Sequence, residues 1–448
     1  MTLGRMNIAV APVAPLSADS VLSFLLQAGA LLATAVILGR LAQRVGLPAI
    51  VGELSAGVLL GPSVFGALGV WDGPSTEELH LLDAAGLLGV LLLVGCSGTE
   101  LDLRMVRKRG GTAAKISAGG LLIPLVLGVA AGFVIPLSLI SGSADRTVVA
   151  LFLGVAMCVS AIPVIAKTLL DMNLLHRTVG QLTLTASVID DIFGWMMLSV
   201  VSAMATTGLR TGTVVGSVIA ISTVVLIAAF VLRPLAKVAL RRGPVLGPVV
   251  VIILLGAAGT QALDLEAVFG AFVCGVVIAS VLPRPEALAP LRKVVLAVLA
   301  PLFFALAGLR MDLTALADPK VAAVAASILV LAVVGKFIGA GIGALASGLT
   351  RWEALACAAG MNARGVIEVI VAMAGLRLGV LNSSAYTSIV LVAIVTSLMA
   401  PPLLRWAMNR VEHTAEEQLR LNWPPAADEQ EKPALDKALD KEEKSEIS

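Results

Sequence analysis

Charged residues are scarce in this sequence, which has 448 residues, of which 14% are charged and 58% hydrophobic. Soluble domains carry about 25% charged residues, so this composition excludes a soluble globular protein. Aromatic residues are also few, at 4%, with a single tyrosine. The mean hydropathy of +0.98 is typical of a chain that crosses a membrane many times as helices. We therefore expect an all-α polytopic membrane protein.

Residues suited to metal binding and redox chemistry are rare too. There are three histidines and four cysteines, and the cysteines lie far apart inside apolar runs. This spacing predicts small core residues, with neither a disulfide framework nor a metal cluster. The sequence contains no P-loop, hydrolase or redox motif, so we expect neither an enzyme nor a cofactor. An ion gradient is then the expected energy source. The cysteines are Cys96, Cys158, Cys274 and Cys357.

Thirteen apolar runs are predicted to be membrane spans. The loops that follow odd-numbered spans carry 18 Lys and Arg residues, whereas the loops on the other side carry 6. The positive-inside rule then places the N-terminus outside and the C-terminus in the cytoplasm of a cell membrane. A cleaved signal peptide is not expected, because Pro12 and Pro15 interrupt the first apolar stretch. The runs lie near residues 21–39, 48–63, 80–98, 112–137, 147–170, 178–206, 213–232, 245–263, 267–283, 294–311, 321–346, 353–376 and 385–408.

Two of these spans are interrupted by residues that break helices. The fifth contains Pro163, which lacks a backbone donor and clashes with the preceding turn, although Pro163 alone would also fit an ordinary kink. The twelfth contains Gly360 and Gly365, with Asn362 and Arg364 between them. The two spans are seven apart, and an odd offset gives them opposite directions across the membrane. We therefore predict inverted repeats, spans two to six and nine to thirteen, with two broken crossing helices as in secondary transporters.

Two adjacent aspartates, Asp190 and Asp191, lie in the middle of the sixth span, an apolar run from about Val179 to Ala205. A carboxylate at the centre of a membrane helix costs roughly 3 kcal/mol on insertion scales, so its presence there indicates function. Successive residues of a helix point about 100° apart. The two carboxylates therefore cannot meet at one point. We expect one to face an ion path and the other to meet a partner on a neighbouring helix.

Four other charged residues lie well inside predicted spans, away from their ends, and buried charges must be paired or must hold ions. Lys336, in the eleventh span, is the expected partner of the aspartate pair. Arg364 and Glu368 are four residues apart and would pair along a helix, either as a structural pair or as part of an ion site. Glu53, in the second span, fits a structural and a functional role equally well.

Five segments, in order between about Val36 and Met408, together resemble the monovalent cation:proton antiporter-2 family. Two positions depart from the usual pattern of that family. Residues 93–100 (LVGCSGTE) are more polar than usual, and Ala363 stands where proline is common. Because of these two departures, the preference between Na⁺ and K⁺ stays open. The five segments are LPAIVGELSAGVLLGPS (47–63), the aspartate pair, FGAF (269–272), PLFFALAGL (301–309) and MNARG (361–365).

The resemblance implies an inverted-repeat bundle in which a six-helix core carries the ion site between two broken helices. A second part would hold a homodimer together. By the same resemblance, Asp191 binds cation and proton alternately, Asp190 is the partner of Lys336, and Ser160 at the fifth-span break is a polar ligand. Supporting positions are Asn362, Arg364, Glu368 and Glu53.

The predicted function is secondary active antiport, the exchange of Na⁺ or K⁺ for protons by alternating access across the lipid bilayer. Nucleic acid is not an expected partner. An ion channel with the same charged lining would not need inverted broken helices. A Na⁺-coupled organic-solute symporter of related fold is the main alternative, but few polar residues lie near the breaks to line its wider cavity. An intramembrane aspartyl protease is excluded because the two aspartates are adjacent.

We expect two parts in the chain, a membrane antiporter domain over residues 1–408 and a charged cytoplasmic tail over residues 409–448. The tail carries 11 acidic and 6 basic residues and has no apolar pattern. We therefore expect that residues after about Val411 can be removed without loss of transport. Lys336 is either a second proton carrier, which makes exchange electrogenic, or a structural clamp on Asp190.

Overall fold

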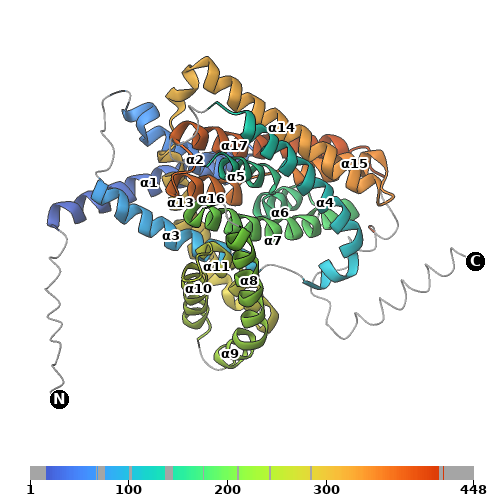
Figure 1. Ribbon diagram of the computed structural model, residues 1–448, viewed down its shortest axis with the longest axis horizontal. Helices are drawn as coiled ribbons and strands as arrows, with labels where there is room; N and C mark the ends of the chain where they lie inside the picture. Colours follow the sequence, from blue (N-terminus) through green and yellow to red (C-terminus); the bar gives the residue numbers. More distant parts are fainter. Residues whose placement is uncertain are drawn as a thin grey trace, which may run out of the picture.

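The computed structural model describes residues 17–66, 68, 76–99, 103–136, 145–174, 176–208, 211–241, 244–282, 285–412 and 417. These residues are almost entirely helical (Figure 1). An all-helical chain is what a membrane dictates, because only helices and closed barrels satisfy every backbone polar group inside lipid. The prediction of an all-α polytopic protein is confirmed.

Most of the helices match apolar runs of the sequence. The α-helices are α1 (Ala18–Arg44), α2 (Ala49–Leu60), α3 (Thr76–Thr99), α4 (Leu103–Val134), α5 (Arg146–Cys158), α6 (Ile162–Asp171), α7 (Thr178–Thr207), α8 (Thr211–Ile227), α9 (Arg233–Ala239), α10 (Leu246–Gln261), α11 (Ala267–Val281), α12 (Ala289–Val294), α13 (Ala300–Leu309), α14 (Pro319–Leu345), α15 (Arg351–Met361), α16 (Val366–Arg377) and α17 (Ser383–Met408). Short π-helical or 3₁₀ segments are η1 (Pro62–Gly66), η3 (Ala228–Leu232), η4 (Pro285–Leu288), η5 (Val295–Leu299) and η6 (Leu313–Ala317).

The helices account for all thirteen predicted spans. Within the described ranges, nine helices are long and apolar enough to cross a membrane, and α15 with α16 forms a further span bent by 43° at a short break. Three shorter apolar helices, α5, α10 and α11, complete the set. Helix α5 is followed by a non-helical stretch at residues 159–161 and then by α6, and the three together form the fifth span. Both breaks therefore lie in the spans where the sequence predicts them.

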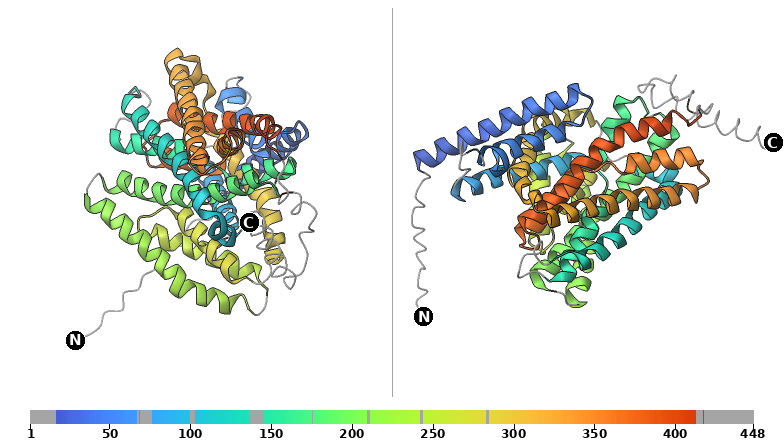
Figure 2. Two further views of the ribbon diagram at one scale, coloured as in Figure 1. Left: turned by 90° about the vertical axis from the view of Figure 1, so that its right-hand side faces the viewer. Right: turned by 90° about the horizontal axis from the view of Figure 1, so that it is seen from above.

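Most of the helices pack as two groups, and α8 and α9 contact both of them through α7 and α11 (Figures 1 and 2). The first group contains both broken spans together with α4, α7, α14 and α17. The second contains α1, α2, α3, α10, α11 and α13. The two groups meet at few places, among them the contact between α7 and α11. The first group therefore contains the segments that carry the buried charges Asp190, Lys336 and Arg364.

Glycine brings α4 and α14 of the first group unusually close. A Cβ atom added at Gly339 would lie 2.1 Å from the backbone oxygen of Gly119, so no side chain fits there. Small residues allow such close approach of helices in membranes, where packing rather than hydrophobicity drives association. Because Lys336 lies one turn before Gly339, this contact places the lysine beside the backbone of α4.

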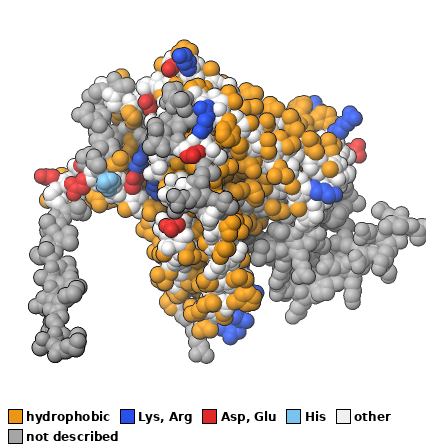
Figure 3. All heavy atoms as spheres, in the orientation of Figure 1, with side chains coloured by type: hydrophobic (Ala, Val, Ile, Leu, Met, Phe, Trp, Pro, Cys, Tyr) orange, Lys and Arg blue, Asp and Glu red, His pale blue; other side chains and the backbone are white. Residues whose placement is uncertain are grey.

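Large apolar side chains also cover the outside of the molecule. Exposed leucine, valine and isoleucine side chains are frequent on α1, α8, α9 and α10. In Figure 3, hydrophobic side chains cover the block formed by α8, α9 and α10 as far as a group of basic side chains at its lower end. In water such a surface would drive association, whereas in a bilayer it contacts lipid.

The chain after α17 returns to the start of α7. Glu417 is 2% exposed, and its carboxylate lies 2.9 Å from Nε of Arg177. The same carboxylate accepts a hydrogen bond of 2.7 Å from the backbone N–H of Thr178, at the first turn of α7. A negative charge is favourable there because the helix dipole is positive at its N-terminus. Glu417 therefore contacts the membrane domain through its charge, although the tail has no apolar pattern.

We predict that the boundary of the dispensable tail lies beyond Glu417. A chain ending at Arg420 should keep its melting temperature and its transport. A chain ending at Val411 should be less stable by roughly 3 kcal/mol, because the buried guanidinium of Arg177 loses its carboxylate partner. Thermal unfolding of the two purified proteins, followed by tryptophan fluorescence, compares them directly. Equal melting temperatures would show that the Glu417 contact contributes nothing.

Candidate functional site

The two broken spans contact each other at their breaks. The backbone N–H of Ala161, between α5 and α6, donates to the carbonyl oxygen of Ala363, between α15 and α16, over 3.0 Å. The hydroxyl of Ser160 donates to the carbonyl oxygen of Met361 over 2.8 Å. Irregular backbone is tolerated at membrane depth only where its polar groups find partners within the protein. Here each break supplies partners for the other, and the predicted crossing of two broken helices is confirmed.

Asp190 is the centre of this region and is 0% exposed. Its Oδ1 accepts a hydrogen bond of 2.6 Å from Ser117 of α4. Its Oδ2 accepts a hydrogen bond of 2.7 Å from Nζ of Lys336 and lies 2.8 Å from the hydroxyl of Ser160, whose single proton is shared between Asp190 and the carbonyl oxygen of Met361. Three donors from three other segments therefore surround one carboxylate. The predicted pairing of Lys336 with an aspartate is thus present, and the aspartate is Asp190.

Lys336 is also fully buried and has a partner for each of its three N–H groups. Besides Asp190, its Nζ donates to the carbonyl oxygens of Gly120, over 3.0 Å, and Cys158, over 2.7 Å. A lysine side chain carries three donors when it is an ammonium ion. The geometry therefore describes a charged lysine that is completely coordinated by the protein.

The C-terminal end of α5 is held by two cations. Lys336 binds the carbonyl oxygen of Cys158, as described above, and Arg364 donates to that of Ala156 over 2.9 Å. Arg364 also donates to the carbonyl oxygen of Ala332 over 3.2 Å. The last carbonyl groups of a helix have no partners within it and carry a partial negative charge. The break in the fifth span leaves such groups at membrane depth, and the two cations satisfy them.

Asp191, the next residue, has a different environment. It is 2% exposed, and its Oδ1 is buried without a hydrogen-bond partner. Asn362, in the twelfth-span break, is fully buried as well, and neither atom of its side-chain amide has a partner. An unsatisfied buried polar group costs about 1–3 kcal/mol, so each one calls for an explanation such as an ion, a proton or a water. Asp191 and Asn362 therefore keep unsatisfied polar atoms at the crossing, as does Nε of Arg364, whereas both carboxylate oxygens of Asp190 have partners.

Arg364 and Glu368 form the pair that their spacing predicts. Nη1 of Arg364 lies 3.6 Å from Oε1 of Glu368, and both side chains are buried. Arg364 lies in the break, whereas Glu368 lies in the first turn of α16, where the helix dipole favours a negative charge. Oε2 of Glu368 has no partner. The pair holds α16 against the end of α5.

Glu53 belongs to the packing of the second group. It is buried on α2, and a Cβ atom added at Gly39 of α1 would lie 3.2 Å from its Cγ. The structural and the functional role of Glu53 both remain open. In contrast, the structure adds Ser117 of α4 to the site, a residue that the sequence analysis does not identify. A single serine in an apolar run carries no signal, because its role depends on which helix lies beside it.

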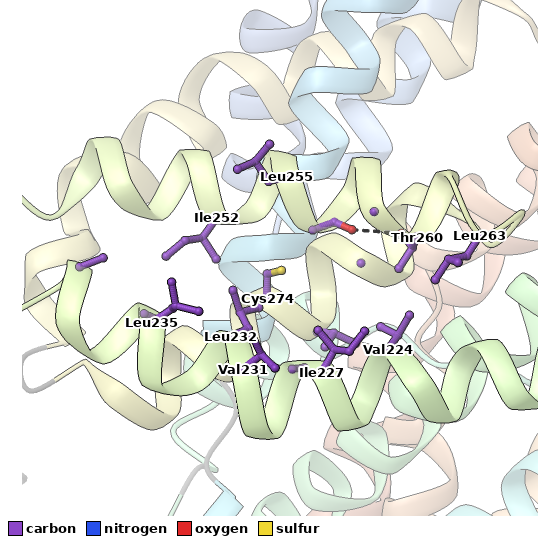
Figure 4. A pocket seen from close by; sticks show the side chains of 17 residues that line it. Val224, Ile227, Val231, Leu232, Leu235, Ile252, Leu255, Thr260, Leu263 and Cys274 are labelled. Atoms are coloured by element: carbon purple, nitrogen blue, oxygen red, sulfur yellow. Dashed lines mark hydrogen bonds between the residues drawn. The ribbon is translucent and has the colours of Figure 1, made fainter.

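One cavity among the described residues is an apolar groove that none of these charged side chains lines. It has a volume of about 440 Å³ and lies between α8, η3 and α9 on one side and α10 and α11 on the other (Figure 4). The described residues that line it are apolar except for Thr260, whose hydroxyl donates to backbone carbonyls. This groove therefore offers no set of polar ligands for a cation.

Comparison with known proteins shows the family to which this chain is related. The family model described as sodium/hydrogen exchanger, transmembrane, matches residues 30–410. The chain is 31% identical to the Na⁺/H⁺ antiporter NhaS4 of Synechocystis over 391 residues, which cover 82% of this chain and 93% of that protein. It is 26% identical to the Na⁺/H⁺-K⁺ antiporter GerN of Bacillus cereus, and the match covers 86% of this chain and 96% of that protein. Cation/H⁺ antiporter 15 of Arabidopsis thaliana is 30% identical, but the match covers only 44% of that longer protein and 80% of this chain.

The fold resembles that of a solved antiporter. The structure of the sodium proton antiporter MjNhaP1 from Methanocaldococcus jannaschii superposes with a TM-score of 0.64, at 16% identity, and covers 87% of this chain and 99% of that one. At such low identity the superposition establishes the fold alone. The match of the family model over most of the sequence establishes the relationship. This chain belongs to the transmembrane sodium/hydrogen exchanger family.

Proposed function

We propose that this protein exchanges a monovalent cation, Na⁺ or K⁺, for protons, and that Asp191 is the site that the two ions share. The difference between the two aspartates carries the proposal. Asp190 accepts hydrogen bonds from Ser117, Ser160 and Lys336, whereas Asp191 keeps a buried carboxylate oxygen without a partner. A free carboxylate beside a saturated one is suited to bind an exchangeable ion.

Exchange follows from competition for that carboxylate. A bare charge is unfavourable inside the membrane, so Asp191 is stabilised by either a proton or a cation. If both loaded forms move between the two sides and the bare form does not, each cation is exchanged for protons. The division into two helix groups that meet at few places supports such movement by alternating access. Ser160 then orients Asp190, while Asn362 offers amide oxygen and nitrogen atoms that have no other partner.

We also propose the placement of the protein in the membrane. The excess of Lys and Arg in alternate loops, 18 against 6, supports a cell-membrane protein whose N-terminus is outside and whose C-terminus is in the cytoplasm. The resemblance to the cation:proton antiporter-2 family supports a homodimer. A regulatory role of the tail would act through the Arg177–Glu417 contact.

A Na⁺-coupled symporter of an organic solute is the alternative. It would need a cavity that holds the solute and presents polar groups to it. The side chains at the crossing leave no such space among the described residues, since Asp190, Lys336, Asn362 and Arg364 are all 0% exposed. A small inorganic ion therefore fits this site better.

Proton flux in proteoliposomes tests the proposal. Purified protein is reconstituted with a pH-sensitive dye inside, a pH gradient is imposed, and Na⁺, K⁺, Li⁺ or choline is added outside. We expect the gradient to collapse with Na⁺ or K⁺ and to persist with choline and in protein-free liposomes. Sodium uptake that requires an organic solute and moves no protons would contradict antiport.

A further inference from the structure

Beyond the crossing, α7 carries a second row of buried polar atoms. Trp195 and Ser199 follow Asp191 at intervals of four residues, so the three side chains lie within an arc of about 80° on one face of the helix. Nε1 of Trp195 and Oγ of Ser199 are buried without partners. The hydroxyl of Ser187, on the same helix, instead bonds to the carbonyl oxygen of Thr183. Unpartnered donors in a buried row are suited to contact water or an ion.

The row continues to a cavity at one end of the bundle. The hydroxyl of Ser202 is also buried without a hydrogen-bond partner. Ser202 and Arg377, at the end of α16, both lie close enough to Glu266, the residue that precedes α11, to lower the pKa of its carboxyl group. The cavity has a volume of about 200 Å³ and lies between α16 of the first group and α3, α10, α11 and α13 of the second. The count of basic residues assigns this end to the outside. Burial raises the pKa of Glu266, while Ser202 and Arg377 act to lower it.

An aromatic contact separates this cavity from the ion site. The ring of Trp195 lies 6.2 Å from that of Phe272 of α11, measured between ring centroids, and both side chains are buried. Asp191 and Ser202 are eleven residues apart along α7, a distance of about 17 Å at 1.5 Å per residue. Trp195 lies between them along the helix, and Asp191 is 2% exposed.

We propose that the cavity beside Glu266 is a capture site for a hydrated monovalent cation on the outer face. Ser202 and Ser199 would then lead the cation along α7 to Asp191 when the rings of Trp195 and Phe272 separate. The inference rests on the proposed antiport function. A carboxylate at the mouth of a cleft raises the local concentration of cations. Hydroxyl oxygens replace water around an alkali ion as it is dehydrated, and Arg377 holds the carboxylate in place while the site is empty.

Sided transport measurements test this assignment. In right-side-out and everted membrane vesicles, Glu266→Gln should raise the KM for a cation offered on the outer face roughly fivefold, because the local attraction is lost. The KM at the inner face and the maximal rate should not change. Asp264→Asn is the matched control, since Asp264 is an exposed carboxylate two residues away. Equal behaviour of the two variants, or an equal KM shift at both faces for Glu266→Gln, would overturn the capture site.

Thiol labelling provides an independent readout. In a chain whose four cysteines are replaced by alanine, Ser199→Cys should react with a membrane-impermeant thiol reagent added outside, during transport. Ser187→Cys, on the same helix but packed inside the first group, should remain unlabelled. Absence of label at position 199 in an actively transporting protein would refute the path. If wild-type vesicles showed no cation/proton exchange at all, the antiport function itself would be contradicted. Failure of the capture site and failure of the antiport function therefore give different results.

Discussion

Asp191→Asn should abolish cation-dependent proton flux while the protein remains folded. Asparagine keeps the shape of aspartate but cannot ionise, so neither a proton nor a cation can be exchanged at this position. Because Oδ1 of Asp191 has no hydrogen-bond partner, the substitution removes no bond to that atom. A carboxylate at membrane depth costs roughly 3 kcal/mol on insertion scales. The substitution removes this carboxylate, so the stability of the protein should be equal or higher.

The dye assay in proteoliposomes and thermal unfolding of the same preparation measure the two effects. The expected result is a flux no greater than that of protein-free liposomes, together with an unchanged or raised melting temperature. Asp264→Asn provides the same chemical change at an exposed site and should transport normally. Wild-type exchange in Asp191→Asn would move the ion site elsewhere and refute the central role of Asp191.

Lys336→Gln should have the largest effect on stability. The substitution leaves the carboxylate of Asp190 buried without its cation and removes donors from the carbonyl oxygens of Gly120 and Cys158. Loss of one partner of a buried ion pair destabilises by about 3–5 kcal/mol. The double variant Asp190→Asn/Lys336→Gln carries no unpaired charge and should regain most of that loss. Unfolding free energies of the two single variants and the double variant give the coupling between the residues, and additive effects would show that the pair is energetically unimportant.

Transport by the double variant tests whether Lys336 carries a proton. If a cation entering the site separates Lys336 from Asp190 and the lysine releases its proton, two protons exchange for one cation and net charge moves. A membrane potential would then drive proton flux in the wild type without an ion gradient, at about 2.3 kcal/mol per charge per 100 mV. We expect this flux in the wild type and its loss in the double variant. Electroneutral exchange in the wild type would leave Lys336 as a clamp on Asp190.

The sequence by itself determined the class of the protein and the position of its spans. Composition and apolar runs indicate a membrane protein, because a helix that crosses the hydrocarbon core of a bilayer must be long and apolar. Pro163, Gly360 and Gly365 marked the two breaks, since these residues act on the local backbone. The aspartates were found because a charge at membrane depth is costly enough to be conspicuous. Helical geometry also predicted that Asp190 and Asp191 would have different environments.

Only the tertiary structure decided the partners of these residues. Which atoms surround Asp190 depends on the rotation and close approach of α4, α7 and α14, and the contact between Gly119 and Gly339 has no counterpart in an apolar pattern. Ser117 and the carbonyl oxygens of Gly120 and Cys158 were therefore beyond prediction. The same holds for Glu417, whose binding to Arg177 depends on how the chain returns to α7. Hydropathy is a local property, whereas coordination of a buried charge is set by residues distant in the sequence.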